Sequence, residues 1–199
     1  MAEVREAAAQ LVASRLRETI SIKQSMLNSA CIDQAVAVAA AMVSCLRSGG
    51  RVLFFGNGGS SMDAGHLSAE LSGRFYRDRP ALAGISLSDS TAAMTAIAND
   101  YAYDNVFARQ VQALGRRGDV AIGLTTSGNS RNVVEALKAA ADIGMYTVAL
   151  TGQAGGKVAD VARICIQVPS DDTPRIQEAC MHLGHTICEL VEQEMFPAA

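Results

Sequence analysis

Two residues able to exchange protons, His66 and Glu70, lie four positions apart in a segment whose pattern predicts a helix. At this spacing an imidazole and a carboxylate share one face of a helix. A glycine-rich turn, residues 56–60, follows an apolar run and would present backbone N–H groups to an anion at the helix N-terminus. The capping-box spacing of Ser60 and Asp63 predicts where this helix starts. One segment therefore offers an anion-binding turn and, about two turns later, an acid–base pair.

Further candidate ligands lie in the last predicted helix, residues 174–195, where Gln177, Met181 and His185 form one i, i+4, i+8 row. Two histidines, one glutamate and one glutamine could hold a divalent metal, with Zn²⁺ or another first-row ion suited to imidazole and oxygen ligands. The same groups could instead transfer protons. His182 lies off this row and is expected to pack or to be solvated.

A second anion-binding candidate is the hydroxyl-rich segment 125–130, which follows an apolar strand and precedes a helix. Neutral O–H and N–H donors there could surround a phosphate. The segment lacks the Gly-Lys pair of a Walker A loop, and the alternative interpretation is a helix N-cap with spare polar residues. Asn99 and Asp100 end another helical stretch, where they could form a turn or bind sugar hydroxyls.

The elements that must position these residues alternate from residue 51 onward. Strands are expected near 51–55, 83–87, 119–124, 146–151 and 163–168. Helices are expected near 61–74, 90–98, 103–114, 130–143 and 174–195, with a partly helical turn near 155–160. This alternation predicts a parallel sheet with helices on both faces, and ligands bind beyond the carboxyl ends of such strands. Two N-terminal helices, 3–28 and 32–47, are expected to form an antiparallel hairpin, the second ended by Ser48-Gly49-Gly50.

Composition narrows the class of protein. The chain has 199 residues, 49% of them apolar and none of them Trp, enough for one aliphatic core. A net charge of −3 without a basic run argues against a nucleic-acid-binding surface. We expect neither a secretory signal nor a membrane span. The five cysteines are odd in number and lack CxxC spacing, so we expect reduced, mostly buried thiols in a cytoplasmic protein.

Together these motifs resemble the sugar isomerase (SIS) domain family and, within it, the phosphoheptose isomerases. The resemblance covers nearly the whole chain. It is carried by Gly56-Asn57-Gly58-Gly59-Ser60, His66-x-x-x-Glu70, Asn99-Asp100-Tyr101, Thr126-Ser127-Gly128-Asn129-Ser130, and Thr173-Pro174-Arg175-Ile176-Gln177-Glu178 followed by His185. The hydroxyl-rich loop alone indicates only an SIS domain, whereas the four candidate metal ligands at these spacings are more specific.

The resemblance implies a flavodoxin-like three-layer α/β/α fold with a five-stranded parallel sheet. It implies a single SIS domain over residues 1–199, with helices in 1–48 and the α/β core in 49–199. It also implies a homotetramer with active sites between subunits.

The resemblance further assigns the site residues. Sugar binding is implied for Asn57, Gly58, Gly59, Asn99 and Asp100. Phosphate binding is implied for Ser60, Thr125, Thr126, Ser127 and Ser130. One Zn²⁺ per subunit is implied on His66, Glu70, Gln177 and His185, of which Glu70 and Gln177 would also contact the substrate.

The implied reaction is the isomerisation of sedoheptulose 7-phosphate to D-glycero-D-manno-heptose 7-phosphate through an enediol. It would be the first step of ADP- or GDP-heptose synthesis for lipopolysaccharide or other surface glycans. We assign Glu70 as the base at carbon and His185 as the acid–base group at oxygen, and Zn²⁺ would polarise the carbonyl. A carboxylate bound firmly to zinc is a poorer base, so the two uses of Glu70 compete.

Three positions depart from the family pattern: Thr125 stands where serine is frequent, Gly65 precedes the metal histidine, and Cys180 replaces an expected histidine. Gly65 costs its helix about 1 kcal/mol relative to alanine. Two alternatives stay open. One is a non-catalytic SIS protein similar to the DnaA initiator-associating protein, against which Glu70, Gln177 and His185 together argue. The other is an isomerase of the arabinose-5-phosphate type, which usually carries extra C-terminal domains, whereas we expect none beyond the last helix here.

Overall fold

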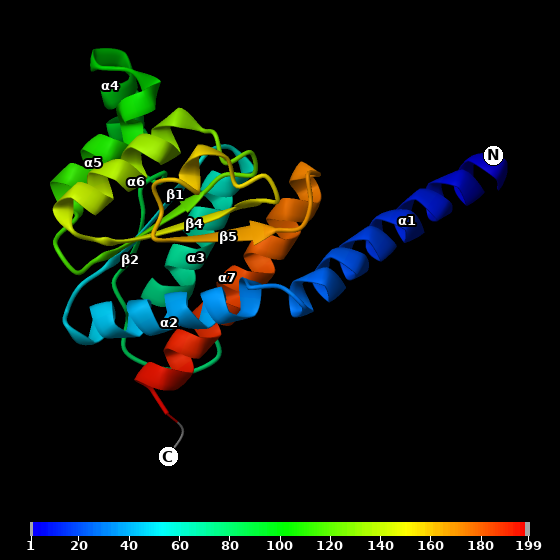
Figure 1. Ribbon diagram of the computed structural model, residues 1–199, viewed down its shortest axis with the longest axis horizontal. Helices are drawn as coiled ribbons and strands as arrows, with labels where there is room; N and C mark the ends of the chain where they lie inside the picture. The colour runs from blue at the N-terminus through cyan, green and yellow to red at the C-terminus, as the bar shows by residue number, and fades with distance from the viewer. Residues whose placement is uncertain (1, 198–199) are drawn as a thin grey trace.

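A five-stranded parallel sheet forms the centre of the computed structural model, which describes residues 2–197 (Figure 1). The strand order β2-β1-β3-β4-β5 is the flavodoxin-like order. The strands are β1 (Val52–Gly56), β2 (Gly84–Ser86), β3 (Val120–Leu124), β4 (Tyr146–Gly152) and β5 (Ile164–Val168). All neighbouring strands pair in parallel, which confirms the predicted sheet.

Helices cover both faces of the sheet and make two hydrophobic cores. One core packs under α2 (Cys31–Arg47), α3 (Gly59–Ser72) and α7 (Thr173–Met195). The other packs under α4 (Thr91–Asp100), α5 (Val106–Leu114) and α6 (Arg131–Ile143). Within β1, Phe54 faces the first core and Phe55 the second. A strand buried on both sides must be apolar throughout, which explains its continuous apolar run.

The N-terminal helix α1 (Ala2–Leu27) projects away from the rest of the chain (Figure 1). Both N-terminal helices are confirmed, but the antiparallel hairpin expected between them is wrong, because α1 and α2 meet at a bend of 74°. Apolar side chains on α1 stay exposed, including Leu11 at 56% and Leu16 at 61%. The helical period predicts an apolar face on α1, but it does not determine which element packs against that face.

No single helix among residues 2–197 combines the length and apolar content needed to cross a bilayer. Only α1 and α2 taken together across their bend reach the required length and composition.

Two glycines with positive φ lie at helix ends, one at the start of α3 and one after the end of α2. Gly58 is the N-cap of α3 at φ 56°, and no side chain caps the helix. Ser60 therefore lies inside the first turn, and the predicted capping box is wrong, because the glycine turn starts the helix before Ser60. Gly49, at φ 74°, follows the C-cap of α2, as predicted.

Short 3₁₀ turns occupy two of the predicted helical stretches. The turn Tyr103–Asn105 replaces the expected start of the helix over 103–114. The turn Gly156–Val158 confirms the partly helical segment near 155–160.

Candidate active site

Three predicted side chains from two helices meet at the surface of the chain. His66 and Glu70 come from α3, and His185 comes from α7. His66 Nε2 lies 2.9 Å from Glu70 Oε1 and 3.1 Å from His185 Nε2. The His66 side chain is 51% exposed and that of Glu70 is 19% exposed. We call these three residues the His–Glu–His cluster; a substrate can reach it from solvent.

A glycine allows the two helices of this cluster to approach closely. Gly184 immediately precedes His185, and a Cβ at Gly184 would lie 2.7 Å from Leu67 Cδ2. Leu67 follows His66 and is buried. A larger residue at position 184 would have to displace the Leu67 side chain, so Gly184 favours the close approach of α3 and α7 that brings His185 to His66.

The geometry of the His–Glu–His cluster suits a divalent metal. Its three ligand atoms lie within 4.8 Å of one another. Four-coordinate Zn²⁺ with bonds of about 2.0–2.1 Å places neighbouring ligand atoms roughly 3.3 Å apart, close to the observed separations. Two imidazole nitrogens that face each other cannot both donate a proton, but both can offer a lone pair to one cation.

Gln177, the fourth predicted ligand, lies beside the glycine-rich turn. Its amide is so near Gly59 that a Cβ at Gly59 would collide with it. The structure thus brings three of the four predicted metal ligands into contact and places the Gln177 amide against the N-terminus of α3.

The predicted sugar-binding residue Asn57 belongs to an amide network that sequence reasoning missed. Asn57 and Asn132 exchange two Nδ2–H···Oδ1 hydrogen bonds of 2.8 Å each. The Tyr103 hydroxyl also donates to Asn57 Oδ1, at 2.9 Å. Asn132 is 2% exposed. In the sequence, the only sign of this network was an asparagine in the first turn of α6. The network holds the turn after β1 against α6, with its backbone open at Gly58.

The hydroxyl-rich loop after β3 leads into the N-terminus of α6, a place where an anion is favoured. Ser130 is the N-cap of α6 but makes no side-chain capping bond; its Oγ instead lies 3.1 Å from Thr125 Oγ1. Gly128 adopts φ 69°, and a Cβ there would collide with the Gly155 carbonyl. Ser127 is exposed, whereas Thr126 is half-buried. The loop and the turn after β1 follow neighbouring parallel strands, so both lie at the edge where ligands bind.

Other predicted residues lie apart from this assembly. Asn99 and Asp100 are exposed at the end of α4 and hydrogen-bond to each other at 2.9 Å. Across residues 2–197 neither side chain forms a hydrogen bond with a member of the His–Glu–His cluster or of loops 56–60 and 125–130. Ser60 is only 6% exposed, so its side chain lies beneath the turn.

The remaining histidine and the cysteines fit structural roles. His182 is exposed, which agrees with the predicted alternative that this side chain is solvated. All five cysteines are free thiols, and four are buried, which confirms the prediction of mostly buried thiols. Burial raises the pKa of Cys180 to about 12. Its thiol stays protonated near neutral pH and is a poor nucleophile.

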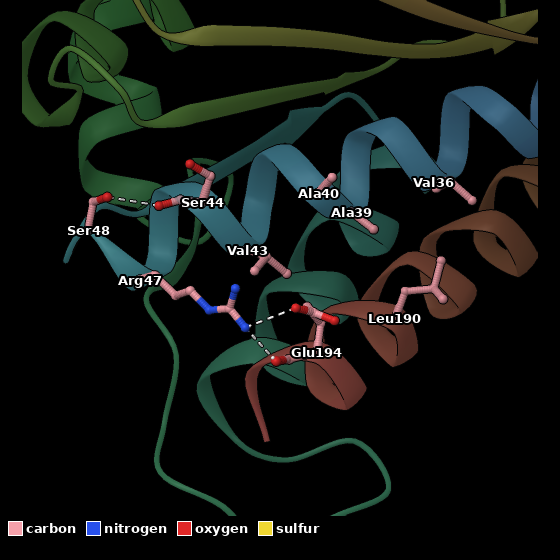
Figure 2. A pocket seen from close by; sticks show the side chains of 9 residues that line it. All are labelled: Val36, Ala39, Ala40, Val43, Ser44, Arg47, Ser48, Leu190 and Glu194. Carbon is pink, nitrogen blue, oxygen red and sulfur yellow. Dashed lines mark hydrogen bonds and ion pairs between the residues drawn. The ribbon is translucent and has the colours of Figure 1, made fainter. Parts of the chain in front are cut away.

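A separate groove lies between α2 and α7 (Figure 2). Its volume is about 530 Å³, and an ion pair of 3.0 Å between Arg47 and Glu194 closes one end. It is lined by Val36, Ala39, Ala40, Val43, Ser44, Arg47, Ser48, Leu190 and Glu194. None of these is a candidate site residue, and the groove is separate from the His–Glu–His cluster.

The fold and site agree with a known class of protein. The SIS-domain family pattern matches residues 7–152, which is more than half of the chain. The chain belongs to the SIS-domain family.

Relatives narrow the assignment within that class. The phosphoheptose isomerase of Rhodospirillum rubrum is 50% identical over 162 residues, covering 81% of this chain and 86% of that protein. That of Aquifex aeolicus is 49% identical over 177 residues, covering 89% and 92%. The structure of phosphoheptose isomerase from Neisseria gonorrhoeae superimposes with a TM-score of 0.87 at 42% identity, covering 92% and 98%. The chain is therefore placed among the phosphoheptose isomerases, as its motifs predicted.

Proposed function

We propose that the protein converts sedoheptulose 7-phosphate into D-glycero-D-manno-heptose 7-phosphate and so begins the synthesis of a nucleotide-activated heptose. The observation that carries this proposal is the direct contact among His66, Glu70 and His185. It occurs in a chain about half identical to proteins named phosphoheptose isomerase. The non-catalytic alternative is not favoured by these relatives.

The reaction needs a base at carbon and an acid–base group at oxygen. Glu70 would take a proton from C1 of the open-chain ketose as the C1=C2 double bond of the enediol forms. His185 would give a proton to O2 and then remove one from O1. The protonated Glu70 would return a proton to C2, which completes the aldose. His66, hydrogen-bonded to Glu70, would hold the carboxylate in place.

A panel of sugars tests this proposal. We expect the protein to convert sedoheptulose 7-phosphate to an aldose phosphate and to leave unphosphorylated sedoheptulose and shorter ketose phosphates largely unchanged, as NMR spectra would show. Faster conversion of a pentulose phosphate would favour the arabinose-5-phosphate type of isomerase. No conversion of any sugar would favour a binding protein.

We propose one Zn²⁺ per subunit as cofactor, held by His66, Glu70, His185 and Gln177. The fit of the His–Glu–His cluster to a tetrahedral ion supports this proposal. When bound, the metal supplies a Lewis acid for the substrate oxygens. A carboxylate bound to a cation is a weaker base. Activity measured against zinc concentration therefore distinguishes Glu70 as a metal ligand, where zinc raises activity, from Glu70 as a free base, where zinc lowers it.

Metal removal should destabilise the protein. We expect dialysis against a chelator to lower the melting temperature and added zinc to restore it, since a ligand at 100 times its Kd stabilises by about 2.7 kcal/mol. His66→Gln should abolish the response, whereas His182→Gln, outside the cluster, should keep it. Elemental analysis without bound metal, together with no effect of zinc on melting, would leave only the proton-transfer role.

Serine hydroxyls of the loop after β3 should bind the substrate phosphate. We expect Ser127→Ala and Ser130→Ala each to weaken binding of sedoheptulose 7-phosphate by about 1–3 kcal/mol, the effect of losing a hydrogen bond to a charged group. Stability should change little, because Ser130 makes no capping bond. Calorimetric titration measures this, with unphosphorylated sedoheptulose as the control. Equal binding of both sugars by the unmutated protein would show that the loop is only a helix cap.

We further propose a cytoplasmic homotetramer with active sites at subunit interfaces. Exposed apolar side chains on α1 support an interface with a second copy. The exposed His–Glu–His cluster suits a site completed by a neighbouring subunit. Light scattering after gel filtration should give four chains per particle; a monomer would contradict the proposal.

A further inference from the structure

A buried ion pair outside the candidate active site joins α7 to the segment that follows α3. Arg79 Nε lies 3.0 Å from Glu192 Oε1, and each side chain is only 2% exposed. Charges this deeply buried persist only when hydrogen bonds satisfy them. The partners of the two side chains therefore show what the pair does.

Glu192, on α7, binds the backbone after α3. It accepts hydrogen bonds from the N–H groups of Phe75 at 3.1 Å, Tyr76 at 2.8 Å and Arg77 at 3.0 Å. Burial alone would raise the pKa of Glu192, but these donors and Arg79 outweigh it and hold that pKa below its usual range. The carboxylate thus stays charged and fixes three consecutive residues against α7.

Arg79 binds the end of α3. Its Nη2 donates to the Glu70 carbonyl at 2.7 Å, and its Nη1 donates to the Leu71 carbonyl at 2.7 Å. A cation at a helix C-terminus satisfies otherwise unpaired carbonyls and is favoured by the helix dipole. The residue proposed as the carbon base therefore has its backbone held directly by Arg79.

The same segment also reaches the second proposed reacting group. The Phe75 ring stacks on the His185 imidazole, with centroids 5.7 Å apart and an interplanar angle of 24°. Glu192 holds Phe75 by its backbone N–H. One ion pair is thus linked to Glu70 through its carbonyl and to His185 through an aromatic ring.

We propose that Arg79 and Glu192 are positioning residues that set Glu70 and His185 relative to each other; the proposal rests on the proposed function. A displacement of about 1 Å between reacting groups can cost roughly 100-fold in rate. Across residues 2–197, neither side chain hydrogen-bonds to loops 56–60 or 125–130. Disturbing the pair should therefore lower kcat and leave the binding of the sugar phosphate largely intact.

Conservative variants test this separation. We expect Glu192→Gln and Arg79→Lys each to lower kcat about 10–100-fold, with KM within about threefold of the unmutated value. The matched control is Glu194→Gln, which removes a charge from the same helix and breaks only the exposed pair with Arg47; its kcat should stay unchanged. A folded Glu192→Gln protein with unchanged kcat would overturn the proposal. So would a decrease in kcat that is no larger for Glu192→Gln than for Glu194→Gln.

NMR spectra test the positioning of His185 without a measurement of turnover. The chain has only three histidines, so a ring-labelled sample gives a simple spectrum that His182→Gln helps to assign. Glu192→Gln should shift the His185 signal and leave the His182 signal in place. Phe75→Leu keeps the ion pair and so serves as a second test if the other variants misfold. It should shift the same signal and also lower kcat. An unmoved His185 signal in both variants would overturn the proposal, whereas an unmutated protein that converts no sugar would overturn only the proposed function.

Discussion

Glu70→Gln is expected to lower kcat for sedoheptulose 7-phosphate by about 10²–10⁴-fold while the protein stays folded. Glutamine keeps the shape of the side chain and a hydrogen bond to His66, but it cannot take a proton from carbon. The Glu70 side chain is part-exposed, so its neutralisation leaves no deeply buried charge without a partner. Steady-state kinetics and thermal melting of the purified variant measure both effects.

The matched control for this variant is Asp63→Asn. Asp63 is the other carboxylate of α3, and no hydrogen bond joins it to the cluster within the described residues. We expect its kcat to stay within about threefold of the unmutated value. Near-normal turnover by Glu70→Gln would defeat the assignment of the carbon base.

His185→Gln is expected to lower kcat by about 10²–10⁴-fold, because the group that moves protons between the two oxygens is lost. The fold should persist, since the imidazole is only half-buried at the surface of α7. The control His182→Gln lies three positions earlier on the same helix and should keep full activity. If excess zinc restored His185→Gln to normal turnover, His185 would be a metal ligand only.

Much of the fold follows from local sequence pattern. The continuous apolar run of β1 predicts a strand covered on both faces, and Phe54 and Phe55 do enter different cores. The angle between α1 and α2 could not be predicted in this way. Apolar positions such as Leu11 mark a face of α1 that α2 was expected to cover, and this face is exposed instead.

The contacts of the candidate site can likewise be separated into those that the sequence predicts and those that it does not. His66 and Glu70 share a helix, so their contact follows from spacing alone. The contact with His185 joins residues 119 positions apart, and only the family resemblance predicted it. Arg79 and Glu192 are 113 positions apart. In the sequence both are charged residues in polar surroundings, typical of a surface, and only the tertiary structure shows their burial.

Isomerisation in D₂O, with the unmutated protein and Glu70→Gln side by side, tests the central claim most directly. Because the part-exposed Glu70 carboxyl exchanges its proton with solvent, proton transfer through an enediol predicts that the unmutated protein forms D-glycero-D-manno-heptose 7-phosphate carrying deuterium at C2. Glu70→Gln should form almost none of this product in the same time. NMR spectra of the products measure both conversion and label. Recovery of unchanged sedoheptulose 7-phosphate from the unmutated protein at every zinc concentration, or equal conversion by the two proteins, would contradict the claim that the His–Glu–His cluster isomerises this sugar.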